Sequence, residues 1–144
     1  MQLYSQNDPL WRWKKIGKSP WTLGQKGCVT TDVSMSASYF GQEITPGIMV
    51  DKLNYTTGGL LLWESVKNVG LKFLWRGFKY EPAKIDEALK NPKKTCLLNV
   101  DRGAHWVLGI YRVPFINKFW VADPFTGKRR FYSDVVGYSI LGKQ

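Results

Sequence analysis

Residues 95–132 read TCLLNVDRGAHWVLGIYRVPFINKFWVADPFTGKRRFY. Apolar and aromatic runs alternate here with short turn segments that contain Gly, Pro or Asn, a pattern typical of successive antiparallel strands. The expected strands span residues 95–101, 104–113, 118–123 and 128–132. The stretch therefore predicts an antiparallel sheet in the C-terminal part of the chain.

The chain before this stretch has helical periodicity. A first helix should begin at or just after Cys28 and end before Gly41, because apolar residues recur there at helical intervals. Short helices are also expected over residues 46–53, 60–69 and 82–89, with a strand over 71–75, whereas residues 1–27 read as an irregular wrap. Because helices precede strands, the sequence predicts an α+β fold with N-terminal helices packed on a C-terminal antiparallel sheet. The apolar positions of the first helix are Val29, Val33, Ala37 and Phe40.

The length of 144 residues predicts a single domain over 1–144, and a hydrophobic fraction of 44% is enough to build its core. The longest apolar run covers residues 60–63 and stops at Glu64, so no membrane-spanning helix is expected. Residues 1–13 lack the continuous apolar segment of a secretory signal. The expected location is therefore the cytoplasm of the producing cell or a virion.

The chain is strongly basic. Twenty-one Lys and Arg residues against eleven Asp and Glu leave a formal charge of +10. Such a charge predicts an anionic partner, and nucleic acid, anionic lipid and acidic cell-wall polymers all meet that description. The basic residues occur in small groups that indicate faces of a folded body rather than a disordered tail. These groups are Lys14, Lys15 and Lys18, then Lys93 and Lys94, then Lys128, Arg129 and Arg130.

Cysteine and histidine are too few for a structural metal or a disulfide framework. The chain has two cysteines and one histidine, which cannot supply a four-ligand zinc site. Cys96 would share a strand face with Leu98 and Val100, which predicts a core residue. No metal and no cofactor are expected.

Three residues are placed where they would meet. His105 stands near the start of an expected strand, and Pro114 lies midway between His105 and Asp123, so an antiparallel return brings the carboxylate beside the imidazole. Cys28 stands at a helix start, where backbone N–H groups and the helix dipole stabilise a thiolate. Together they form a constellation like that of a cysteine protease. Taken singly, Asp123 is also explained as a turn residue and Cys28 as a small core residue.

Four short runs carry these residues: QNDPLW (6–11), LGQKGC (23–28), HWV (105–107) and VADPFTG (121–127). In this order they resemble the papain-like peptidases related to the C39 bacteriocin-leader peptidases, particularly the C39-like group of bacterial and phage proteins. The resemblance implies that Cys28 is the nucleophile, His105 the general base and acid, and Asp123 the residue that orients His105. It implies that Gln6 donates to the oxyanion, with Gln25 as a competing candidate because the exporter peptidases have their glutamine nearer the cysteine.

Resemblance and charge together predict a free-standing cysteine-dependent amide hydrolase that acts on peptidoglycan peptides in the bacterial cell wall. A peptidase for proteins or leader peptides is one alternative. The other is a basic binding module of the same fold for nucleic acid or a virion component, because basic groups interleaved with aromatic residues also suit single-stranded nucleic acid. Most of the seven tryptophans are expected in the core, whereas Trp106 adjoins His105 and is expected to shield it or to line the cleft.

Overall fold

The computed structural model describes residues 1–144, and it combines helices with one antiparallel sheet. The helices are α1 (Leu23–Lys26), α2 (Cys28–Tyr39), α3 (Pro46–Lys52) and α4 (Pro82–Lys90), with 3-10 helices η1 (Trp63–Val69) and η2 (Asp101–Gly103). The strands are β1 (Leu71–Gly77), β2 (Lys94–Val100), β3 (His105–Arg112), β4 (Lys118–Asp123), β5 (Lys128–Ser133) and β6 (Gly137–Lys143).

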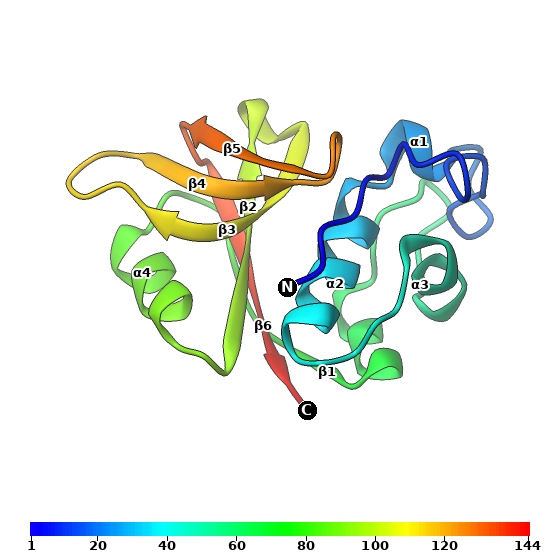
Figure 1. Cartoon of the computed structure of the whole chain (residues 1–144), viewed down its shortest axis with the longest axis horizontal. Helices are drawn as coiled ribbons and strands as arrows, with labels where there is room; N and C mark the ends of the chain where they lie inside the picture. The colour runs from blue at the N-terminus through cyan, green and yellow to red at the C-terminus, as the bar shows by residue number, and fades with distance from the viewer.

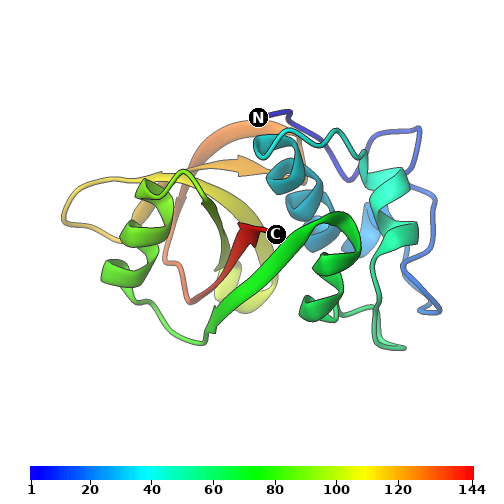
Figure 2. The same cartoon turned by 90° about the horizontal axis from the view of Figure 1, so that it is seen from below.

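The six strands form one sheet in the order β1-β6-β2-β3-β4-β5, and each neighbouring pair is antiparallel. Helices α1, α2 and α3 gather on one side of the sheet and α4 lies on the other (Figure 1). Figure 2 shows the same division from below, with η1 on the side of α2 and α3. The sheet therefore separates two apolar cores.

Strand alternation explains the two cores. Leu97 and Leu98 are consecutive residues of β2, and they point to opposite faces of the sheet. Leu97 joins the core under α2, which includes Val33 and Met49, whereas Leu98 joins the core under α4, which includes Ile85. Both cores are built from side chains with little or no exposed surface.

Strand β6 was not predicted from the sequence. It pairs with β1 on one side and β2 on the other, so it is central rather than peripheral. Its residues are buried up to Gly142, and Gly137 and Gly142 stand near its two ends. Glycine is unfavourable in strand interiors, so the two glycines weaken the sequence pattern that would predict a strand here. The two strands that pair with β6 are also distant in the sequence.

The helix expected over residues 60–69 differs from the structure. It is a 3-10 helix that begins at Trp63, and Leu60 and Leu62 are exposed in the loop before it. Strand β1 extends to Gly77, beyond the expected end. No helix in the structure is both long and apolar enough to cross a membrane.

Helix α2 is buried on more sides than its apolar stripe predicts. Val33 and Ala37 lie in the core as expected, and Val29 and Phe40 pack against it with part of their surface exposed. The polar residues between them are buried as well, Asp32 among them, because α2 is packed against both β3 and α3. The N-terminus of this helix, at Cys28, faces the end of the sheet where β3 begins and β4 ends.

Tryptophan burial was predicted only in part. Trp11 is buried, whereas Trp13, Trp21 and Trp75 are exposed by 66%, 38% and 48%. The expectation that most tryptophans anchor the core is wrong for these three. Cys96, by contrast, is fully buried in the core under α4, as expected.

Candidate active site

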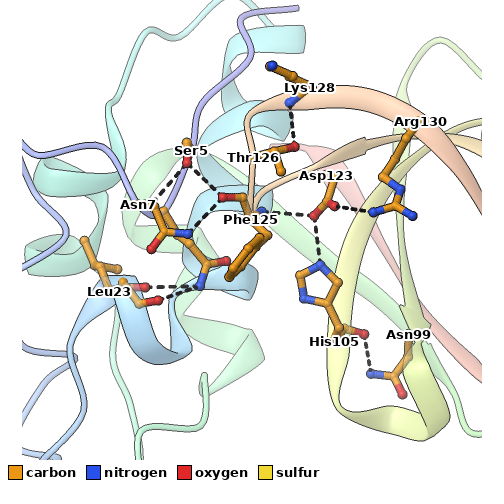
Figure 3. Close-up of polar contacts among 12 residues, drawn as sticks. Ser5, Asn7, Leu23, Asn99, His105, Asp123, Phe125, Thr126, Lys128 and Arg130 are labelled. Carbon is orange, nitrogen blue, oxygen red and sulfur yellow. Dashed lines mark hydrogen bonds and ion pairs between the residues drawn. The ribbon is translucent and has the colours of Figure 1, made fainter.

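Histidine and aspartate meet across the β3–β4 hairpin. Leu108 pairs with Ala122, so the return strand brings Asp123 back toward the beginning of β3. His105 Nε2 lies 2.9 Å from Asp123 Oδ1, a hydrogen-bonding distance (Figure 3). The structure therefore places these two residues side by side, as the spacing around Pro114 predicts.

Asp123 is held in place by two further contacts. Its side chain is only 1% exposed, the Phe125 backbone N–H donates to Oδ1 at 3.0 Å, and Arg130 Nη1 lies 3.7 Å from Oδ2. Burial favours the neutral acid, but the bonds from His105 and Phe125 and the nearby cations outweigh it and lower the pKa of Asp123. The same carboxylate thus accepts a bond within the turn after β4 and contacts the imidazole, so its position agrees with the structural and with the orienting interpretation.

The imidazole of His105 has two neighbours that act on its charge. Nε2 faces Asp123 at hydrogen-bonding distance, and Cys28 is near enough to contribute to the pKa of the ring. With Nε2 engaged, Nδ1 is the nitrogen that remains for the thiol. Burial opposes the imidazolium, but Asp123 and Cys28 outweigh that effect and raise the pKa of His105 to about 9. At neutral pH the imidazolium form is therefore favoured.

Cys28 is the first residue of α2. It follows Gly27, which is the helix N-cap, and its thiol is partly exposed. The first N–H groups of a helix have no acceptor inside the helix, so they are free to bind an anion that forms at this position. Burial raises the pKa of the other thiol, Cys96, which keeps that sulfur protonated in the core. Only Cys28 combines access with a neighbouring imidazole.

Gln6 connects the two halves of the site. Its backbone N–H donates to the Pro124 carbonyl at 2.7 Å, next to Asp123. Its side-chain Nε2 donates to the carbonyls of Leu23 and Gly24 at 3.3 and 3.2 Å, in the helix just before Cys28. Gln6 is 3% exposed, and its Oε1 has no hydrogen-bond partner.

Gln25 has a different function in the fold. Its Oε1 accepts the backbone N–H of Thr22 at 3.0 Å and so caps α1, and the residue is exposed. Of the two glutamines, only Gln6 is buried and joined to both segments that carry site residues. In the structure both hydrogens of its Nε2 are bonded to backbone carbonyls, so donation to an oxyanion requires that substrate replace one of these two bonds.

Solved structures match this arrangement of helices and sheet, among them one peptidase domain. The chain superposes on the peptidase domain of Streptococcus ComA, a bifunctional ABC transporter involved in a quorum-sensing pathway. The TM-score is 0.59 at 12% identity, and the match covers 83% of this chain and 93% of that domain. The fold is that of a papain-like peptidase domain.

The match confirms the α+β, papain-like architecture predicted from the sequence, and it supports a C39-like fold. No family model and no curated protein matches the sequence. At 12% identity the likeness concerns the fold alone.

Sequence reasoning missed Asn99, which bonds the backbone at the start of β3, where His105 stands. Three consecutive residues before β3 have positive φ: Asp101 (52°), Arg102 (57°) and Gly103 (96°). A left-handed conformation costs a non-glycine residue about 1–2 kcal/mol. The 94%-buried Asn99 offsets this cost, since its Nδ2 donates to the carbonyls of Gly103 and His105, both at 3.3 Å (Figure 3).

A second missed residue is Asp32, one helical turn beyond Cys28. It is fully buried, and neither of its carboxyl oxygens has a hydrogen-bond partner. Burial raises the pKa of Asp32 well above its ordinary value, and the nearby Cys28 and Asp123 raise it further. The surroundings of Asp32 therefore favour its neutral, protonated form.

Two hollows flank the thiol and the imidazole. A cleft of about 360 Å³ is lined by Cys28 and Trp106 but not by His105. A shallower hollow of about 310 Å³ is lined by His105 and Tyr132 but not by Cys28. Trp106 thus lines the cleft beside the thiol, and its ring also packs on Trp63 with centroids 5.4 Å apart. No three His, Cys, Asp or Glu side chains gather where they would hold a metal ion.

Proposed function

We propose that the protein is a cysteine-dependent amide hydrolase whose reacting groups are Cys28 and His105, with Asp123 as the residue that positions the imidazole. The observation that carries the proposal is the His105 imidazole, which lies 2.9 Å from Asp123 at Nε2 and has the Cys28 thiol, at the start of α2, as its other neighbour. A buried carboxylate that fixes the ring and favours its cation is the third member of such a site.

The reaction is acyl transfer. The Cys28 thiolate attacks the amide carbonyl carbon, and the Cys28 backbone N–H stabilises the oxyanion. Gln6 adds a second donor when substrate replaces one of the backbone carbonyls that its Nε2 contacts. Imidazolium His105 gives its Nδ1 proton to the leaving nitrogen as the C–N bond breaks, which leaves a thioester on Cys28. Neutral His105 then takes a proton from water, the hydroxide attacks the thioester, and the thiolate leaves with a carboxylic acid as product.

The substrate we propose is the peptide part of bacterial peptidoglycan. The formal charge of +10 favours an anionic polymer, because long-range attraction raises its concentration at the surface. Three exposed basic residues, Lys128, Arg129 and Arg130, stand on the edge strand β5 beside Asp123. An anionic wall polymer bound along this edge would lie next to the reacting groups.

The test is digestion of purified peptidoglycan, with the released fragments identified by mass spectrometry. The parent protein and Cys96→Ala should release the same peptide fragments, and Cys28→Ala should release none. Fragments from Cys28→Ala would overturn the nucleophile assignment. Cleavage of a peptide library but not of the wall would retain the hydrolase and remove the wall substrate. Wall or nucleic-acid binding without any cleavage would identify a binding module.

A further inference from the structure

The cleft beside Cys28 and the hollow beside His105 are lined by different residues. In the proposed hydrolysis, on which this inference rests, the acyl group stays bonded to Cys28 while the leaving nitrogen takes its proton from His105. Cys28 lines the larger cleft and not the hollow, and the reverse holds for His105. The acyl part of the substrate therefore belongs in the cleft, and the amine part on the side of His105.

The walls of the cleft are mainly apolar and aromatic. Trp21 and Leu60 stand at its exposed rim, and Tyr55 and Trp106 lie deeper. The Tyr55 hydroxyl is 2.5 Å from the Thr30 hydroxyl, so this ring is fixed against α2. Such walls suit the carbon skeleton and main chain of a peptide.

A glycine pair forms one wall of the cleft without side chains. Gly59 has φ +87°, and a Cβ at this position would lie 3.0 Å from Ser19 Oγ and 3.4 Å from Trp21 Cδ1. The neighbouring Gly58 has open space around it, with Thr56 Oγ1 as the nearest atom at 3.8 Å. The backbone at 58–59 is therefore bare toward the cleft, and an extended substrate chain can approach it closely.

Lys26 is the only charged residue that lines this cleft. It stands two positions before Cys28 in the last turn of α1, and its Nζ lies 5.1 Å from the centroid of the Trp21 ring. None of the ion pairs in the structure includes it. The ammonium is thus placed at the rim by the aromatic face and has no carboxylate of the protein as its partner.

We propose that the cleft binds the acyl side of the substrate and that Lys26 selects amides with a carboxylate on that side. Cys28 and Lys26 both line the cleft, so a substrate whose carbonyl meets the thiol can bring a carboxylate on its acyl side to the ammonium. The aromatic walls and the glycine pair accept a peptide main chain. A neutral or basic group in place of the carboxylate loses the charge-assisted contact with Lys26.

The experiment uses peptidyl diazomethyl ketones, which label an active cysteine without a knowledge of the natural scissile bond. The thiolate displaces dinitrogen from the reagent carbon, which takes its proton from the imidazolium, and a thioether to Cys28 remains. Two reagent pairs are compared, with Glu or Gln either next to the ketone or one position further along the acyl chain. Intact-mass measurements give the labelling rate in the parent, in Lys26→Gln and in the matched control Lys67→Gln, which changes the net charge equally at an exposed site outside the cleft.

In at least one of the two reagent pairs, the parent and Lys67→Gln should react about tenfold faster with the Glu reagent than with the Gln reagent, as expected for one charge-assisted contact. Lys26→Gln should react equally with both members of that pair, at the rate that the parent shows with the Gln reagent. Equal rates in the parent, or a Glu preference that survives in Lys26→Gln, overturn the inference and leave the hydrolase in place. Failure of every reagent to label Cys28 refutes the proposed function itself.

Discussion

The protonation of His105 can be measured without any resonance assignment, because it is the only histidine in the chain. The structure gives its imidazole a pKa of about 9 rather than 6.5. Asp123→Asn retains the shape of the side chain and its turn, but it removes the negative charge beside Nε2. We expect this substitution to lower the pKa of His105.

The size of the change follows from the causes of the shift. Burial of His105 favours the neutral ring, and the bond to Asp123 is the largest of the effects that oppose burial, ahead of Cys28. An opposite charge in direct contact typically moves a pKa by about 1–3 units. Asp123→Asn should therefore lower the pKa by about 1–2 units, and Cys28→Ala should lower it by a smaller amount.

The stability of the fold should show the same effect. The folded pKa of His105 is raised above its unfolded value, so the contribution to stability is complete below pH 6.5 and is lost as the pH rises through about 9. The parent should therefore lose more stability than Asp123→Asn over this interval, as measured by thermal melts at a series of pH values.

The titration is followed through the imidazole signals in ¹H–¹⁵N spectra of uniformly labelled protein. Glu87→Gln serves as the control, because Glu87 is a surface carboxylate that pairs with Lys94 on the other side of the sheet from Cys28. This variant should leave the pKa of His105 unchanged. A parent pKa near 6.5, or a value that Asp123→Asn does not move, would refute the assignment of Asp123.

Four other substitutions test neighbouring parts of the site. Because the pKa of Asp32 is raised, the folded state holds the carboxyl proton of Asp32 more tightly than the unfolded state, and the stability of the fold should fall as the pH rises above 3.8. Asp32→Asn should make the stability measured in urea melts depend less on pH, and an unchanged pH dependence would contradict a neutral Asp32. Asn99→Ala should lower the stability of the fold by about 1–2 kcal/mol and should slow the labelling of Cys28 by diazomethyl ketones. Labelling at the parent rate would show that Asn99 does not position His105. Gly59→Ala should lower the stability of the fold by about 1–2 kcal/mol because Gly59 has a positive φ. Gly58→Ala should change the stability by less than about 0.5 kcal/mol, and equal losses in the two variants would contradict the positive φ at Gly59.

The parts of the site that depend on local pattern were predictable. The distance along the chain from His105 to Asp123 and the turn near Pro114 are sufficient to predict their contact, because an antiparallel hairpin converts sequence spacing into spatial proximity. The start of α2 at Cys28 follows from the apolar stripe and the residues before it. These features need no information about the rest of the fold.

Features that depend on long-range packing were not predictable in the same way. Asp32 looks like a solvent-facing helix residue, but it is buried because α2 is packed against β3 and α3. Strand β6 is central because it pairs with two strands that are distant in sequence. Asn99 is recognisable only once the left-handed turn at 101–103 exists, since non-glycine residues rarely adopt that conformation.

The most direct test of the reactive Cys28–His105 pair is the pH dependence of alkylation by iodoacetamide, which is measured by peptide mass analysis. At pH 6, Cys28 should be alkylated about tenfold or more faster in the native parent than in His105→Ala, because the imidazolium stabilises the thiolate. Cys96, which is fully buried, should react only after unfolding. Alkylation of Cys28 at the same rate in both proteins would contradict its activation by His105. Alkylation of Cys96 faster than Cys28 in the native parent would contradict the assignment of Cys28 as the reactive thiol.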